Sequence, residues 1–154
     1  MSLVIYTDGA SRGNPGRGGY GAILKWGTTE KELSAGYRLT TNNRMELMAV
    51  IEALKALTRE GLDIDIYSDS EYVVNAISKG WLLGWEKKGF AGKKNPDLWQ
   101  QFLRLYRRHN IRMHWVKGHA SNVMNNRCDI LATRAADGNN LLKDEAYEAE
   151  YYNK

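Results

Sequence analysis

The spacing of the apolar residues changes near residue 40, and this change limits the folds that the chain can adopt. Before it, short alternating or β-rich stretches predict strands over residues 3–6, 20–26 and 30–37. After it, the pattern predicts a helix over 47–57, a strand over 64–67, helices over 70–79, 81–88 and 98–106, a strand over 111–116, and a helix over 128–135. Because the later strands need crossover connections, the sequence predicts a mixed sheet with helices on its faces.

Length and composition predict a single domain over residues 1–154. The chain has 154 residues, of which 43% are hydrophobic and 26% are charged, so it is neither disordered nor fibrous. No apolar run reaches the ~18 residues that a membrane span needs. The acidic tail over 139–154 is expected to have weak structure.

The cysteine content and the N-terminal sequence predict a cytoplasmic protein. The single cysteine, Cys128, allows no internal disulfide, which fits a reducing compartment. The first ten residues do not have the pattern of a secretory signal.

Positive charge is concentrated in residues 71–120, which contain 10 Lys or Arg against 3 Asp or Glu. Such an excess indicates a polyanion-binding surface, although a solvated basic face would look the same. Trp81 and Trp85 lie four residues apart on a predicted helix, beside Lys87 and Lys88. Tryptophans at this spacing are often ordinary packing, but with these lysines, and with others at 93 and 94, binding to a nucleic-acid backbone is the favoured interpretation.

Four acidic residues stand where predicted elements begin or end. Asp8 follows the first strand, Glu46 lies in the first turn of the long helix, Asp69 ends the fourth strand, and Asp129 lies in the first turn of the last helix. Strand ends and helix starts converge on a crevice in open sheets, and carboxylates gathered there would hold hard divalent cations.

Each of these acids also has a purely structural interpretation. Asp8 could belong to a turn and Asp69 could cap a helix, while Glu46 and Asp129 could complete capping boxes with Asn43 and Asn126. Capping alone does not explain acids that flank apolar stripes, because an unpaired buried carboxylate is costly and a metal-bound one is not.

Two further features have competing interpretations. His119 lies in a polar loop, where it could shuttle protons or be an ordinary solvated residue. The sequence GRGGYG over 16–21 matches a dinucleotide-binding fingerprint, but an alternating strand follows it where that fingerprint needs a helix. The glycines are therefore interpreted as part of a tight hairpin turn.

Taken together, the motifs resemble those of the bacterial type 1 ribonucleases H. The matching stretches are YTDGASRGNPGRGGYGAIL, TTNNRMELMAVIEAL, YSDSEYV, GWLLGWEKKGF, NPDLW and WVKGHASNVMNNRCDILA, which span nearly the whole chain. The resemblance implies the α/β ribonuclease-H-like fold, a five-stranded mixed sheet with three N-terminal antiparallel strands and two further parallel strands, flanked by helices.

The resemblance also implies an activity and a set of site residues. The activity is hydrolysis of the RNA strand of RNA–DNA hybrids, with two Mg²⁺ ions, or Mn²⁺ in their place, at ~4 Å from each other on either side of the scissile phosphate. One ion would activate water and the other would stabilise the leaving 3′-oxygen, giving 5′-phosphate and 3′-hydroxyl products. The resemblance assigns metal binding to Asp8, Glu46, Asp69 and Asp129, and a role in turnover or product release to His119. It assigns the contacts with the backbone and 2′-hydroxyls of the substrate to Ser11, Asn14, Asn42 and Asn43. It places a DNA-phosphate pocket at Thr41 and Asn95, and the grip on the DNA strand at Trp81, Trp85, Lys87 and Lys88.

The sequence departs from the family pattern at Glu71, Asn126 and Phe90, and has a short loop over 91–96. These departures predict weaker hybrid affinity without loss of activity. A catalytically silent hybrid-binding module is the alternative function, and an ATPase of related fold is a more distant one. No protein partner is implied, and a monomer is expected.

Overall fold

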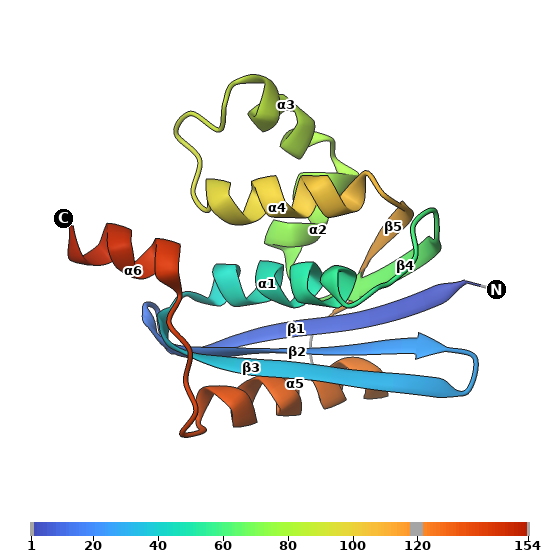
Figure 1. Ribbon diagram of the computed structural model, residues 1–154, viewed down its shortest axis with the longest axis horizontal. Coiled ribbons are helices and arrows are strands. Elements are labelled where there is room, and N and C mark those ends of the chain that lie inside the picture. Colours follow the sequence, from blue (N-terminus) through green and yellow to red (C-terminus); the bar gives the residue numbers. More distant parts are fainter. Residues whose placement is uncertain (1, 118–121, 154) are drawn as a thin grey trace.

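The sheet predicted from the sequence is confirmed in the computed structural model, which describes residues 2–117 and 122–153 (Figure 1). The strand order is β3-β2-β1-β4-β5. Strands β1 (Leu3–Gly13), β2 (Gly16–Trp26) and β3 (Thr29–Thr40) are antiparallel neighbours, and β4 (Asp63–Ser68) and β5 (Asn110–Trp115) continue the sheet in parallel with β1.

Helices cover both faces of the sheet (Figure 1). They are α1 (Asn42–Lys55), α2 (Glu71–Ser78), α3 (Trp81–Lys87), α4 (Pro96–Tyr106), α5 (Val123–Ala136) and α6 (Glu145–Tyr152). Helix α5 packs on one face of β1, β2 and β3, whereas α1 packs on the opposite face and is covered by α4. Within the described residues, every helix is too short or too polar to cross a membrane.

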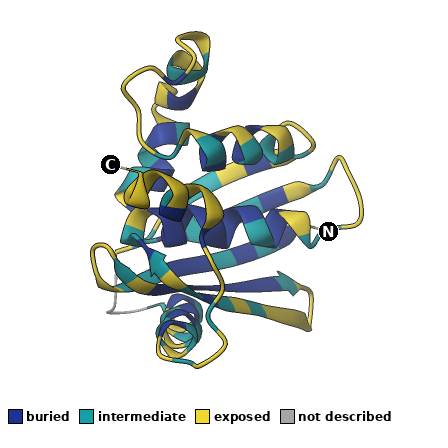
Figure 2. Cartoon of the chain, turned by 60° about the vertical axis from the view of Figure 1, so that its left-hand side comes forward, coloured by how far each residue is buried: buried dark blue, intermediate teal, exposed yellow. Residues whose placement is uncertain are grey.

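The main core lies between the sheet, α1 and α4, where apolar side chains are almost fully enclosed (Figure 2). This layer contains Leu47 and Ile51 of α1, Trp99 and Phe102 of α4, and Ile66 of β4. The helical stripes seen in the sequence therefore mark the packed faces of these two helices.

The glycine-rich stretch over 16–21 forms the first half of β2, so its interpretation as part of a hairpin turn holds only for Gly16. Gly16 pairs with Gly13 beside the turn at 14–15, where a side chain would overlap the Arg12 carbonyl. A side chain at Gly21 would overlap the backbone carbonyl of Cys128 in α5. The absence of a side chain allows α5 to approach the strand opposite Asp8, since Asp8 and Gly21 are paired in the β1–β2 register.

The helix caps differ from those that the sequence predicts. Thr41 caps α1, Ser70 caps α2, and Asn122 caps α5, in each case by accepting a backbone N–H bond in the first turn. The capping boxes of Asn43 with Glu46 and of Asn126 with Asp129 are therefore wrong, as is an N-cap at Asp69. Because α5 begins at Val123, Asp129 lies in its second turn and not its first.

The tail expected to have weak structure contains helix α6 and is paired with β3. The backbone N–H of Leu142 donates to the carbonyl of Gly36 at 2.8 Å, and the Leu142 carbonyl accepts from Arg38 at 2.9 Å. The sequence did not indicate this docking, because the partners are about a hundred positions apart in the chain.

Two ion pairs, one of them buried on both sides, attach the tail to the rest of the fold. Asp144 accepts two hydrogen bonds from Arg44, at 2.7 Å from Nε and 2.8 Å from Nη2, and both side chains are almost fully buried. Arg44 also donates to Asp97, and Arg38 donates to Glu148 at 2.9 Å. Burial tends to lower the pKa of the Arg44 guanidinium, but the two carboxylates more than compensate and raise its pKa overall.

Replacing Asp144 with asparagine is expected to destabilise the protein by about 3 kcal/mol, because it leaves the buried Arg44 with only one carboxylate partner. The free energy of unfolding would be measured by urea denaturation. The control is Asp137→Asn, which breaks the exposed pair with Arg12 and is expected to cost less than ~1 kcal/mol. Equal losses in the two variants would contradict this ranking.

Candidate metal and nucleic-acid site

Three of the four predicted carboxylates meet at one place. One oxygen each of Asp8, Glu46 and Asp69 lies within 4.8 Å of the other two. Asp8 lies in β1, Glu46 in the second turn of α1, and Asp69 directly after β4. Strands β1 and β4 pair in parallel as far as Thr7 and Ser68, so Asp8 and Asp69 leave the ladder at the same level.

Gly9 brings the third carboxylate close to the first. A side chain at this position would overlap the backbone of Met45 and Glu46, so only glycine lets β1 pass against α1 here. The backbone N–H of Gly9 also donates to Oδ1 of Asp8 at 2.8 Å, which orients that carboxylate. The Asp-Gly pair therefore has a packing and orienting role inside a strand, and is not a turn.

The carboxylates raise one another's proton affinity. Asp8 is 6% exposed and Glu46 is 5% exposed. Burial, followed by repulsion from Asp69, raises the pKa of Asp8 to about 8. Burial and the charges of Asp8 and Asp69 raise the pKa of Glu46 well above its usual range.

Two oxygens of the cluster are buried with no hydrogen-bond partner among the described residues, namely Oε1 of Glu46 and Oδ1 of Asp69. Buried acceptors left unpaired are costly in a protein interior. A divalent cation would satisfy these oxygens and neutralise the repulsion, and an all-oxygen ligand set is the one that Mg²⁺ and Mn²⁺ prefer. The residues present therefore fit such an ion.

Asp129, the fourth predicted ligand, is not part of the group within 4.8 Å in the described structure. It lies half-buried on α5 on the other face of the sheet from α1, and its charge is near enough to raise the pKa of Asp8. The structure thus places Asp129 beside the cluster but outside its tightest part. His119 lies outside the described residues.

A polar pocket of about 640 Å³ brings together several of the predicted substrate contacts. Asn14, Thr41, Asn43 and Asn95 line it, and Oδ1 of Asn14 accepts a bond from the backbone N–H of Asn42 at 3.2 Å. Ser11 lies outside this pocket, half-buried in β1, three residues after Asp8. The pocket also contains side chains that the sequence analysis did not assign to it: Arg44, Lys93, Lys94, Tyr147 and Glu150.

Asn95 is held in place by contacts that the sequence did not reveal. Its backbone has a φ of 62°, a left-handed conformation that asparagine tolerates better than most residues. Its Oδ1 accepts a bond from Arg44 at 3.2 Å, and its Nδ2 donates to the Tyr72 hydroxyl at 3.0 Å. Arg44 stands inside the TTNNRMEL motif, so the motif was visible although the role was not.

The two predicted gripping tryptophans have different surroundings. Trp81 is 47% exposed, and the Lys79 ammonium lies 5.2 Å from its ring centroid. Trp85 is half-buried, and its ring centroid lies 5.8 Å from that of Trp99 in the core. Lys87 and Lys88 are exposed at the end of α3. Trp81 is therefore the more accessible of the two, whereas Trp85 also serves packing and has the Lys93 ammonium 5.1 Å from its ring centroid.

The three departures from the family pattern have distinct positions. Glu71 is exposed at the first residue of α2, two residues after Asp69. Asn126 is exposed on α5, about one helical turn before Asp129. Phe90 is buried, so it serves the core and is not available for contact with substrate.

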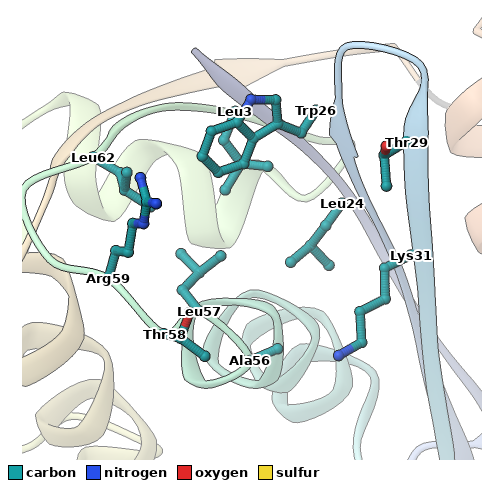
Figure 3. Close-up of a pocket in the computed structure, with 10 residues that line it drawn as sticks. All are labelled: Leu3, Leu24, Trp26, Thr29, Lys31, Ala56, Leu57, Thr58, Arg59 and Leu62. Atoms are coloured by element: carbon teal, nitrogen blue, oxygen red, sulfur yellow. The ribbon is translucent and has the colours of Figure 1, made fainter. Parts of the chain in front are cut away.

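A second hollow, of about 310 Å³, lies near the beginning of β1 and the end of β2 (Figure 3). Leu3, Leu24, Trp26 and Leu57 form its apolar wall, and Lys31 and Arg59 supply its charged groups. None of its lining residues is a carboxylate. The hollow is thus chemically unlike the acidic cluster and has no ligand set for a hard cation.

The chain is similar to proteins of known family over most of its length. The sequence model of the RNase H family matches residues 1–137. A ribonuclease H of Syntrophus aciditrophicus is 52% identical over 94% of this chain and 86% of the relative, and one of Lachnoclostridium phytofermentans is 51% identical over 96% and 100%.

Solved structures agree with this match. The crystal structure of LC9-RNase H1, a type 1 RNase H with the type 2 active-site motif, superposes with a TM-score of 0.80 at 29% identity, over 88% of this chain and 72% of that one. LC11-RNase H1 in complex with an RNA/DNA hybrid has a TM-score of 0.62 at 25% identity, over 88% and 97%. With the strand order and the acidic cluster described above, these matches show that the chain belongs to the ribonuclease H family.

Proposed function

We propose that this ribonuclease H hydrolyses the RNA strand of RNA–DNA hybrids with divalent cations held by Asp8, Glu46 and Asp69, and with Asp129 as a further ligand. The observation that supports this most directly is the convergence of three carboxylates within 4.8 Å, with two of their oxygens buried and unpaired among the described residues. Bound cations of this kind activate water and stabilise the leaving oxygen of a phosphodiester.

The protein's own groups prepare the site for this chemistry. The Gly9 amide holds one oxygen of Asp8, which leaves the other available to a ligand. Burial of Asp8 and Glu46 keeps bulk water away and strengthens the electrostatic attraction of the cluster for a cation. Magnesium is the proposed ion, and manganese can replace it because both favour oxygen ligands. His119 is proposed to assist turnover or product release.

The polar pocket and the basic protrusion are proposed to bind the two strands. Ser11, Asn14, Asn42 and Asn43 would contact the backbone and 2′-hydroxyls of the RNA, which is how a protein distinguishes RNA from DNA. Thr41 and Asn95 would receive a phosphate of the DNA strand, and Trp81 and Trp85 with Lys87 and Lys88 would grip that strand. A hybrid is bound in the solved LC11-RNase H1 complex, which has the same fold.

A binding module without catalysis is the less favoured function. Carboxylates without a bound cation repel phosphates, so an acidic cluster is a poor surface for binding alone. We further propose that the protein acts as a monomer in the cytoplasm, which suits its single buried cysteine.

Asp8→Asn is expected to reduce cleavage of a labelled hybrid in Mg²⁺ by at least about 100-fold, because it removes a ligand charge. The control is Asp63→Asn, which changes an exposed carboxylate at the other end of β4 and is expected to retain activity. Full activity in Asp8→Asn would overturn the proposed metal site.

Cation affinity is expected to rise with pH up to about 8, because the cation must displace the proton that Asp8 retains below this pH. Calorimetric titration with Mn²⁺ at pH 6, 7 and 8 would measure this dependence. If binding displaces one proton, the Mn²⁺ affinity falls by up to about tenfold for each pH unit below 8. An affinity independent of pH would contradict the raised pKa of Asp8.

The raised pKa of Asp8 also predicts that the metal-free protein becomes less stable as the pH rises. The pKa of Asp8 is higher in the folded state than its usual 3.8, so the folded state binds the proton more tightly than the unfolded state does. The resulting stabilisation is complete below about pH 4 and is lost as the pH rises through about 8. Chemical denaturation in the presence of a chelator would measure this loss, and Asp8→Asn should flatten it.

Lys87→Glu combined with Lys88→Glu is expected to weaken hybrid binding by at least about tenfold at low salt and to reduce the salt dependence of the affinity. Binding would be measured by fluorescence anisotropy in Ca²⁺ across a range of salt concentrations. Lys31→Glu with Arg59→Glu makes the same charge change beside the apolar hollow and serves as the control. Equal weakening in both would show a general charge effect and not a local grip.

A further inference from the structure

Asn125 is a buried amide on α5 that contacts β1 and β4 where their parallel pairing ends, next to Asp8 and Asp69. Asn125 is only 8% exposed. The cap of α5 lies three residues earlier, where Oδ1 of Asn122 accepts the backbone N–H of Asn125 at 3.1 Å. This bond fixes the first turn of the helix and, with it, the position from which the Asn125 amide extends.

The side-chain amide of Asn125 links β1 and β4 near the end of their parallel pairing. Its Nδ2 donates to the carbonyl of Thr7 at 3.3 Å and to that of Tyr67 at 3.5 Å. The Thr7 hydroxyl donates to the same Tyr67 carbonyl at 3.4 Å. The Thr7 carbonyl belongs to the peptide group that leads into Asp8, and Tyr67 precedes Asp69 by two residues, so the link acts beside both carboxylate residues, where β1 and β4 stop pairing.

The same residue relates the helix to this pair of strands. Asp129 follows Asn125 by four positions in α5, so the two lie on the same side of the helix, one turn apart. A displacement of Asn125 relative to β1 and β4 would therefore move Asp129 relative to Asp8 and Asp69. Oδ1 of Asn125 is buried without a hydrogen-bond partner among the described residues. The hydrogen bonds of this side chain therefore come from its Nδ2 group, which contacts both strands.

We propose that Asn125 is a positioning residue for the metal cluster, clamping β1, β4 and α5 together so that Asp8, Asp69 and Asp129 face a common cation. This inference rests on the proposed function, because it assumes that the carboxylates bind a cation. Of the side chains of this size and shape, only an amide supplies two N–H donors to two carbonyls. An apolar residue supplies none, and a carboxylate supplies at most one when protonated.

The first test compares Asn125→Leu with Cys128→Ala, with Mn²⁺ affinity of the free protein measured by calorimetry. Cys128 is a matched control, since it is buried on α5 and its Sγ donates to the Tyr6 carbonyl of β1 at 3.2 Å without contacting β4 in this way. Asn125→Leu is expected to weaken Mn²⁺ binding by about tenfold or more, in the range seen when groups that orient metal ligands are removed. Cys128→Ala should remain within about twofold of the parent, although it also loses stability.

The second test uses Asn125→Asp, which has the same shape and serves if the leucine variant does not fold. A further negative charge near the cluster would by itself strengthen cation binding, whereas loss of the clamp weakens it. Weaker Mn²⁺ binding in Asn125→Asp supports the clamp, and unchanged or tighter binding overturns it.

Asp8→Asn separates failure of the clamp from failure of the proposed function. If Asp8→Asn weakens Mn²⁺ binding and neither Asn125 variant does, the clamp is wrong and the metal site stands. If Asp8→Asn leaves Mn²⁺ binding unchanged, the metal site itself is wrong, and the clamp is overturned with it.

Discussion

The parallel pairing of β1 with β4 is the contact on which the site depends. These strands are separated in the chain by two further strands and a helix, yet they are adjacent in the sheet and in register from Leu3 with Ile64 to Thr7 with Ser68. Parallel neighbours point their carboxyl ends in the same direction, so residues that follow both strands emerge side by side. Asp69 is such a residue, Asp8 follows the last position at which β1 pairs with β4 although β1 itself continues to Gly13, and α1 adds Glu46.

Clustering these acids opposes folding, and the surrounding structure offsets the cost. Mutual repulsion and burial work against the charged forms of Asp8 and Glu46. Stabilisation comes from elsewhere, mainly from the apolar layer between the sheet, α1 and α4 around Trp99 and Phe102. The site is therefore a locally unfavourable arrangement supported by a rigid framework, as is common where charge is concentrated for a function.

Much of this architecture is predictable from the sequence, because periodicity reports local structure. The change from alternating to helical spacing correctly indicated all five strands and the order of helices α1 to α5. It also indicated that Asp8, Glu46 and Asp69 converge, although Asp8 lies inside β1 and not after it, and Glu46 lies in the second turn of α1 and not its first. Start and end points were less predictable: α5 begins at Val123 because Asn122 caps it, a position that apolar spacing does not reveal.

Features that depend on distant partners were not predictable. Helix α6 has little apolar patterning, and its attachment rests on Asp144 and Glu148 meeting arginines in β3 and α1. Likewise, Gly21 looks like a turn residue until α5 is seen against it, and Asn125 looks like any polar helical residue until its two carbonyl partners are located. The roles of such residues come from tertiary contact and not from local preference.

The ion pair between Arg44 and Asp144 affects the order in which parts of the protein can fold during synthesis. During synthesis Arg44 and Asp97 emerge well before Asp144, which follows Arg44 by 100 residues. Until that residue arrives, the guanidinium lacks one of its two compensating carboxylates, and the wall that Tyr147 and Glu150 contribute to the polar pocket is missing. The nascent chain can therefore assemble its sheet and acidic cluster first, while the polar pocket is completed only after the segment with Asp144, Tyr147 and Glu150 has been synthesised.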